Sequence, residues 1–220
     1  MSEINFLDKY QKATQRDYVA RVVEHDKAEC ALVAKQWGRD YWDGDRRFGY
    51  GGYQYDGRWR PIAEDIARHY GLKAGDRVLD IGCGKAFLLY ELTQAVPGLM
   101  VAGLDISDYA IANAREEVRS FLQVGHASRL PYESDSFDLV LSLNTFHNLE
   151  IFDLKQAVQE MERVGCGDKW LCVESFRNES EKANLLYWQL TCMSFYSPEA
   201  WTWLYRRWGY SGDFGFIYFE

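Results

Sequence analysis

One short turn has residue types that suit ligand binding. An apolar stretch leads into Asp80, and Gly82 and Gly84 follow with one residue between them. Glycines allow a backbone to approach a ligand closely, and the first N–H groups of a following helix are open to hydrogen bonding. Position 87 is Phe, so the GxGxxG pattern of dinucleotide sites is incomplete, and no GxxxxGK[ST] loop is present. The acid beside this turn needs a cationic or hydroxylated partner, and the missing third glycine makes NAD a poor candidate.

A second unusual stretch, Asp40 to Arg60, precedes this turn. Its 21 residues include seven aromatics, five glycines, four acids and four arginines. Disordered segments do not use aromatics at this density, so the stretch must pack on something. We expect a cap over the ligand site, with a wall formed by Tyr41, Trp42, Tyr50, Tyr53 and Tyr55. In that arrangement an anionic group would bind Arg46, Arg47 or Arg58. The alternative is that Asp43, Asp45 and Asp56 pair with these arginines and the aromatics cover the first helices.

The elements that position these residues alternate between strand and helix. Strands are expected at 77–81, 100–104, 121–124, 137–143, 170–174 and 214–219. Helices are expected within 1–39 and at 61–70, 85–94, 107–119, 153–163 and from Ser197. This alternation predicts an α/β fold with a mostly parallel, Rossmann-like sheet covered by helices on both faces. Ligands of such sheets bind beyond the carboxyl ends of the strands.

Composition limits the classes of function. The chain has 220 residues, 47% of them hydrophobic, and a net charge of −8. An acidic chain repels polyanions, so nucleic acid is not expected as a partner. The N-terminal residues lack the apolar region of a signal peptide, and no apolar run approaches a bilayer span. Five scattered cysteines without a CxxC pair fit reduced thiols in a cytoplasm and predict no metal site.

Three stretches in order resemble the motifs of class I S-adenosylmethionine-dependent methyltransferases. They are "VLDIGCGKAFLLYEL", "VAGLDISDYAIANAREE" and "VGHASRLPYESDSFDLVLSLNTFHNL". The resemblance runs from about Leu72 to Glu174 and implies S-adenosylmethionine as cofactor. It implies that the methionine part lies against Asp80, Gly82, Cys83 and Gly84. It further implies that Asp105 accepts the ribose hydroxyls, that Ile106 packs on the adenine, that Ala127 and Ser128 line the adenine edge, and that Asn144 lies under the sulfonium carbon.

Two positions depart from the family pattern. Ala86 stands where the third glycine is usual, and a positive φ there would cost about 1 kcal/mol or more. His126 replaces the acid that often contacts the adenine amino group, although a neutral imidazole can still accept one hydrogen bond. Both substitutions would weaken cofactor binding, but neither removes the ribose-binding acid.

Methyl transfer to an oxygen nucleophile usually also requires removal of a proton. His147 follows the strand at 137–143 and is our candidate for the catalytic base, a role that the resemblance supports. The alternative is a structural histidine that caps the next helix. Glu174, at the end of the strand at 170–174, is a second candidate beside the acceptor.

The sequence therefore predicts a cytoplasmic methyltransferase, a monomer or homodimer that acts on a small anionic metabolite, mainly by O-methylation. A phosphorylated or nucleotide-linked sugar would suit the arginine-rich cap. Alternatives are a non-catalytic cofactor-binding sensor or assembly subunit, or an RNA or protein methyltransferase, for which no basic stripe or NPPY motif is present. We expect residues 1–60 to form the helical and aromatic lid and residues 61–220 to form the cofactor-binding core.

Overall fold

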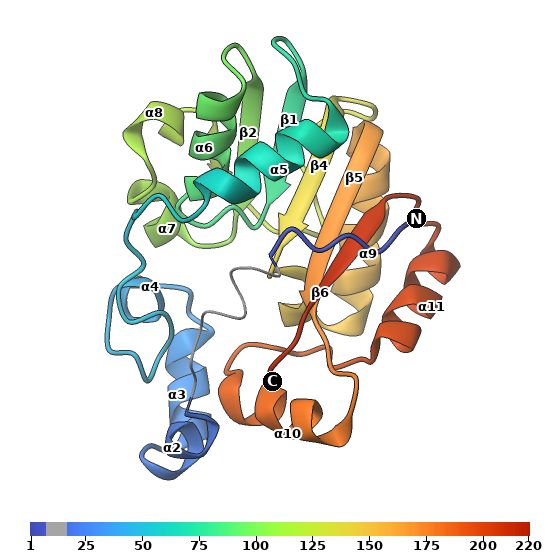
Figure 1. Cartoon of the computed structure of the whole chain (residues 1–220). Coiled ribbons are helices and arrows are strands. Elements are labelled where there is room, and N and C mark those ends of the chain that lie inside the picture. The colour runs from blue at the N-terminus through green and yellow to red at the C-terminus, as the bar shows by residue number, and fades with distance from the viewer. Residues whose placement is uncertain (8–16) are drawn as a thin grey trace.

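The computed structural model describes residues 1–7 and 17–220, in which six strands form one sheet. The strand order is β3-β2-β1-β4-β5-β6, and the five pairings between neighbours are all parallel. The strands are β1 (Arg77–Ile81), β2 (Met100–Asp105), β3 (Leu122–Val124), β4 (Phe137–Leu143), β5 (Gly165–Glu174) and β6 (Asp213–Ile217). Their carboxyl ends therefore meet at one edge of the sheet (Figure 1).

Two groups of helices surround this sheet. The N-terminal helices are α2 (Tyr18–Val23), α3 (Lys27–Ala34) and α4 (Arg39–Trp42). The helices that follow are α5 (Arg60–Tyr70), α6 (Phe87–Ala95), α7 (Asp108–Ala112), α8 (Glu116–Arg119), the 3₁₀ helix η1 (Phe146–Asn148), α9 (Ile151–Val164), α10 (Glu179–Trp188) and α11 (Pro198–Trp208). In the described part of the chain, no helix combines the length and the apolar character that crossing a bilayer requires.

Alternate residues of the strands bury opposite faces of the sheet. Val78 joins the core beneath α5 and α6, whereas its neighbour Leu79 joins the core beneath α9 and α11. Since successive side chains of a strand point to opposite faces, a strand buried on both sides is apolar throughout. This is why β1 and β4 are apolar at most positions, and why the predicted two-sided α/β arrangement is correct.

The first residues differ from the expected helix. Ser2 to Ile4 run alongside β6, where Glu3 forms a parallel bridge with Phe214 and Ile4 donates its N–H to the Phe214 carbonyl at 2.7 Å. Residues 8–16, which fall within the predicted 1–39 helical stretch, lie outside the described residues. The helical prediction was therefore wrong for residues 1–7, because the open edge of β6 offers hydrogen bonds that an extended chain can make.

The expected helix at 107–119 is interrupted, giving α7 and α8. The break lies at Asn113 to Arg115 and turns the Arg115 guanidinium onto the rings of Tyr55 and Tyr90, at 4.7 and 4.2 Å from their centroids. Helix α10 was not predicted, although Asn178 caps it by accepting from the Glu181 N–H at 3.0 Å.

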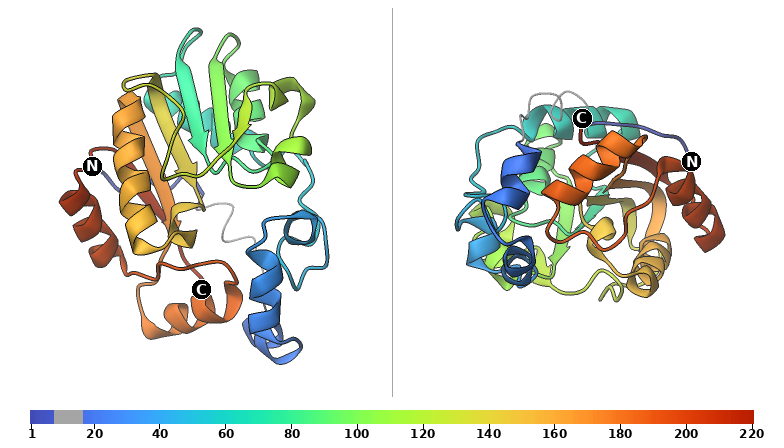
Figure 2. Two further views of the ribbon diagram at one scale, coloured as in Figure 1. Left: turned by 180° about the vertical axis from the view of Figure 1, so that it is seen from behind. Right: turned by 90° about the horizontal axis from the view of Figure 1, so that it is seen from below.

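The N-terminal helices and α10 lie beyond the carboxyl edge of the strands, away from the loops at the opposite edge (Figures 1 and 2). Helix α10 contacts α2, and α4 contacts α7. These segments from both halves of the chain thus cover the edge at which a parallel sheet binds its ligands.

Candidate active site

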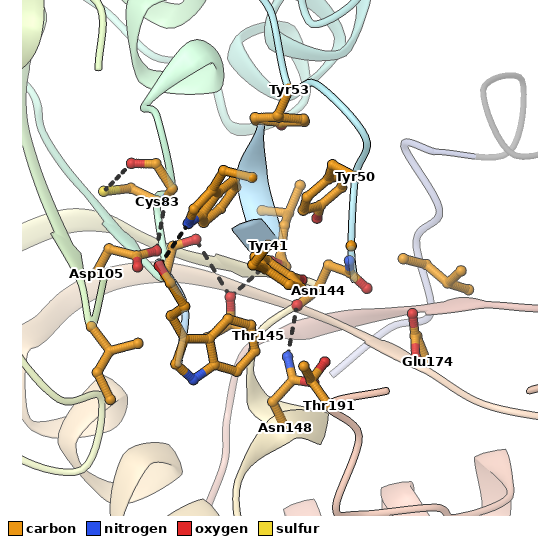
Figure 3. A pocket seen from close by; sticks show the side chains of 18 of the residues that line it. Tyr41, Tyr50, Tyr53, Cys83, Asp105, Asn144, Thr145, Asn148, Glu174 and Thr191 are labelled. Carbon is orange, nitrogen blue, oxygen red and sulfur yellow. Dashed lines mark hydrogen bonds between the residues drawn. The ribbon is translucent and has the colours of Figure 1, made fainter. Parts of the chain in front are cut away.

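A cavity of about 540 Å³ lies at the carboxyl edge of the sheet, within the usual size range of small-ligand sites. Four strand ends contribute polar side chains to it: Asp80 from β1, Asp105 from β2, Asn144 after β4 and Glu174 from β5. Figure 3 shows Asp105, Asn144 and Glu174 with Tyr41, Tyr50 and Tyr53 around the same space. The parallel topology thus brings together residues that are far apart in the sequence.

The Asp105 carboxylate is held by two backbone N–H groups. Gly84 donates to Oδ2 at 2.7 Å, and Ser107 donates to Oδ1 at 2.8 Å. Burial raises the pKa of Asp105, while these two hydrogen bonds act in the opposite direction. A carboxylate has about four acceptor positions, so each oxygen keeps a position for a further donor. Two adjacent hydroxyl groups of a ribose fit this remaining capacity.

Asp80 is buried with one oxygen unsatisfied. Its Oδ1 receives no hydrogen bond from the described residues. Burial, together with the nearby Asp105 charge, raises the pKa of Asp80 to about 7. A ligand with positive charge and N–H donors would hydrogen-bond to Oδ1 and stabilise the ionised carboxylate. S-adenosylmethionine carries such groups, an ammonium and a sulfonium. The residues present therefore fit this cofactor.

The glycines of the turn are required by close approach. A Cβ on Gly82, where φ is +82°, would lie 2.0 Å from Thr145 Oγ1, and one on Gly84 would lie 2.8 Å from the Trp42 ring. Ala86 has a positive φ of 56°, so the backbone strain expected for a non-glycine residue in this conformation is present here. Asn144 also has a positive φ, of 55°, immediately after β4. The cofactor edge thus concentrates backbone conformations that most residues avoid.

A buried ion pair fastens the aromatic segment to the glycine turn. Lys85 Nζ lies 2.6 Å from Asp43 Oδ2, and the side chains of both residues are largely buried. Tyr109 donates to the same carboxylate at 2.9 Å, and the Tyr53 N–H donates at 3.0 Å. The alternative arrangement, in which Asp43 pairs with an arginine, is therefore wrong for this residue, because Lys85 lies beside it.

Other contacts hold the rest of the segment in place. Trp42 donates its indole N–H to Ser107 Oγ at 2.9 Å. Tyr55, predicted as a wall of the cavity, instead hydrogen-bonds to the buried Glu91 carboxylate and lies outside the cavity lining. Tyr50 lines the cavity, and its hydroxyl interacts with the Asn144 and Tyr41 side chains. The segment therefore closes over the cavity as a packed, hydrogen-bonded layer.

His147 lies behind Glu174 and outside the cavity lining, which contradicts its predicted position as base. Its Nδ1 accepts the Glu174 N–H at 3.3 Å, and its Nε2 lies 3.4 Å from Glu174 Oε2. Burial lowers the pKa of His147 to about 3, so the imidazole is neutral at physiological pH. Because Glu174 lines the cavity, the carboxylate is the group of this pair that could touch a ligand.

The remaining predicted site residues divide into two groups. The cavity is lined by Gly82, Cys83, Gly84, Ile106, Ala127, Tyr53, Arg46 and Arg58. Ser128 is absent from that lining and pairs with His126 Nδ1 at 2.7 Å. Arg47 is also absent, because its exposed guanidinium points to Asp45, at 3.9 Å. Arg58 pairs with Asp56, as the alternative arrangement of the segment predicted.

Sequence reasoning missed the contribution of α2 and of the chain after α10. Arg21, Gln189 and Thr191 line the cavity, as does Trp188 at the end of α10. Gln189 donates to Glu174 Oε1. No local motif marks these residues, since their position depends on how α2 and α10 lie beyond the sheet.

Residues 72–208 match the family described as methyltransferase domain. The match covers more than half of the chain, and the fold and the acid pair at the strand ends agree with it. The chain belongs to this family and has the class I, S-adenosylmethionine-dependent methyltransferase fold.

Curated relatives include methyltransferases named for demethylmenaquinone and for 27-O-demethylrifamycin SV. The chain is 30% identical over 141 residues to the demethylmenaquinone methyltransferase of Lysinibacillus sphaericus, covering 61% of this chain and 58% of that protein. It is 28% identical over 129 residues to the 27-O-demethylrifamycin SV methyltransferase of Amycolatopsis mediterranei, covering 54% and 45%. The chain thus spans about half the length of the curated relatives it matches.

Solved structures show the same fold. A Haloferax volcanii protein described as a methyltransferase, in complex with the Trm112 methyltransferase activator, gives a TM-score of 0.54 at 25% identity, covering 70% of this chain and 73% of that one. The YcgJ protein of Bacillus subtilis gives 0.54 at 21% identity, covering 66% of each chain.

Proposed function

We propose that this protein transfers a methyl group from S-adenosylmethionine to a small molecule. The observation that carries the proposal is the cavity at the strand ends, in which the Asp80 and Asp105 carboxylates lie beneath an aromatic layer. Asp105 would bind the ribose hydroxyls, and Asp80 would face the ammonium group. The bound cofactor would supply an electrophilic methyl group, and the chain would contribute alignment and exclusion of water.

A small acceptor suits this cavity better than a macromolecule. The segment at 40–60 is fixed over the sheet edge by the Asp43–Lys85 pair and by the Trp42–Ser107 hydrogen bond. A cavity of about 540 Å³ accommodates a ligand of metabolite size. The guanidinium-bearing side chains of Arg21 and Arg46 in its lining support an anionic acceptor.

The test is a transfer assay with radiolabelled S-adenosylmethionine. The purified protein is incubated separately with a metabolite fraction below about 1 kDa, total RNA and denatured cell protein, a size division that follows from the cavity. Label should enter the metabolite fraction and should be lost in the Asp105→Ala variant. Label in RNA or protein would replace the small-molecule acceptor with a macromolecule. Cofactor binding without transfer to any fraction would favour a non-catalytic sensor.

A further inference from the structure

Two groups of opposite charge line the cavity on either side of the Trp188–Gln189 segment. Gln189 donates to the Glu174 carboxylate. The Trp188 ring lies against two guanidinium groups, with the central carbons of Arg21 and Arg46 at 5.1 and 5.0 Å from its centroid. Consecutive Cα atoms are about 3.8 Å apart, so one short segment of chain contacts both groups. Both groups belong to the lining of the same cavity.

The arginine group, formed by Arg21 and Arg46, favours binding of an anion. Arg21 donates to the carbonyl oxygens of Arg46, at 2.7 Å, and Trp188, at 3.3 Å, and neither carbonyl carries a formal charge. Burial and the neighbouring Arg46 charge both lower the pKa of Arg21. Two like charges on one indole repel each other, and a bound carboxylate or phosphate would relieve that repulsion.

The acidic group, centred on Glu174, favours binding of a hydrogen-bond donor. Glu174 is buried, and its side chain lies within the same part of the cavity as Asn144 and Asn148 (Figure 3). Asn144 Oδ1 and Asn148 Oδ1 are buried and accept no hydrogen bond from the described residues. Buried acceptors are costly when unsatisfied. A nucleophile that carries a proton, as O–H or N–H, would supply the missing donor.

We propose that the methyl acceptor is a bipolar small molecule. Its proton-bearing nucleophile binds at Glu174, and its carboxylate or phosphate group binds between Arg21 and Arg46. This assignment rests on the proposed methyl transfer. A lone pair of the nucleophile forms the bond to the methyl carbon as the carbon–sulfur bond breaks and its electron pair stays on sulfur. Glu174 takes the proton that the nucleophile loses.

In this arrangement His147 and Gln189 are positioning residues. The neutral imidazole lies beside Glu174 Oε2, and the amide of Gln189 binds Oε1. Together they fix the plane of the carboxylate without carrying charge themselves. The acceptor is therefore recognised at two places: its anionic group beside Trp188, and its nucleophile at the carboxylate that Gln189 contacts.

The experiment is a substrate panel on the full chain. Probes are two- to six-carbon amino acids, hydroxy acids and their phosphate analogues, each paired with its uncharged amide or ester, a size range set by the cavity volume. Formation of S-adenosylhomocysteine is measured. For at least one pair, kcat/KM of the anionic member should exceed that of the uncharged member by about 100-fold. This comparison uses the unmodified protein, so it stays decisive if a variant fails to fold.

Three variants then separate the two charged groups. Arg21→Gln and Arg46→Gln should raise KM for the anionic probe by about 10-fold or more, with kcat retained. Glu174→Gln should lower kcat by about 100-fold. All three should bind S-adenosylhomocysteine as the unmodified protein does. Arg206→Gln, an exposed arginine on α11, is the matched control and should change neither constant.

The outcomes distinguish this proposal from the function it rests on. Equal turnover of charged and uncharged members, or full kcat in Glu174→Gln, overturns the bipolar acceptor. Binding of S-adenosylhomocysteine without turnover of any panel member also overturns the bipolar acceptor. The proposed methyl transfer, to another class of molecule, is not contradicted by that result. Failure to bind S-adenosylhomocysteine overturns the proposed function itself.

Discussion

Replacing Asp80 by Asn should stabilise the ligand-free protein above neutral pH. The folded pKa of about 7 lies roughly three pH units above the ordinary 3.8. Each unit corresponds to 1.36 kcal/mol, so the buried carboxylate costs the fold up to about 4 kcal/mol once it is ionised. The folded state holds the proton more tightly than the unfolded state. The free energy of unfolding therefore falls as pH rises from about 4 to 7, and the full penalty is present above pH 7.

Urea unfolding followed by circular dichroism between about pH 4 and pH 8.5 measures this effect. Asp80→Asn should unfold like the unmodified protein near pH 4, where both side chains are neutral, and should be more stable by up to about 4 kcal/mol at pH 8. Asp153→Asn, on the exposed surface of α9, is the control and should change stability by less than about 0.5 kcal/mol throughout.

The same variant should bind cofactor poorly, because a neutral amide cannot pair with an ammonium group. We expect an affinity for S-adenosylmethionine at least about 10-fold lower, so added ligand should stabilise the variant less than the unmodified protein. A stability difference that is constant with pH, or a loss of stability at pH 8, would refute the account of Asp80 as a strained buried charge.

Three further predictions concern the structure around the site. Lys85→Met leaves the Asp43 carboxylate without its ion pair, so it should lower the free energy of unfolding by about 3 kcal/mol and expose residues 40–60 to proteolysis. The control is Lys182→Gln at an exposed ion pair, which should cost less than about 0.5 kcal/mol. Equal losses in the two variants would show that the Asp43–Lys85 pair does not hold the segment in place. Gly82→Ala should destabilise by more than about 2 kcal/mol in thermal unfolding, because its Cβ would meet Thr145 Oγ1 at 2.0 Å, and a neutral result would show that the strand ends can separate. The His147 ring should stay neutral in ¹⁵N NMR down to about pH 4. Because its folded pKa lies below the usual 6.5, the free energy of unfolding should decrease as pH falls from 6.5 toward 3. A titration near pH 6.5 would contradict its assignment as a buried positioning residue.

The sheet was predictable because its strands are buried on both faces. Runs such as those of β1 and β4 are apolar enough to be placed within one residue, and Gly71 marks the end of α5 with a φ of 61°. The break between α7 and α8 was not predictable from local pattern, and at this break Arg115 contacts rings on other segments. Local sequence patterns carry no information about such contacts.

The cofactor side of the site was also accessible from sequence. Asp80, the glycine turn and Asp105 lie at strand ends, and parallel topology brings strand ends together. The acceptor side was not, because Arg21, Trp188 and Gln189 reach the cavity from helices whose positions no motif specifies. His147 shows the same limit. Its place after β4 suggested a base, but burial behind Glu174 depends on how the chain after α10 covers it.

The most direct test of the central claim is a calorimetric titration of the protein with S-adenosylhomocysteine. We expect one site with micromolar affinity, lost in Asp105→Ala, a variant that keeps the fold by circular dichroism. Absence of binding to the unmodified protein, or undiminished binding to Asp105→Ala, would contradict a cofactor site at the carboxyl ends of β1 and β2.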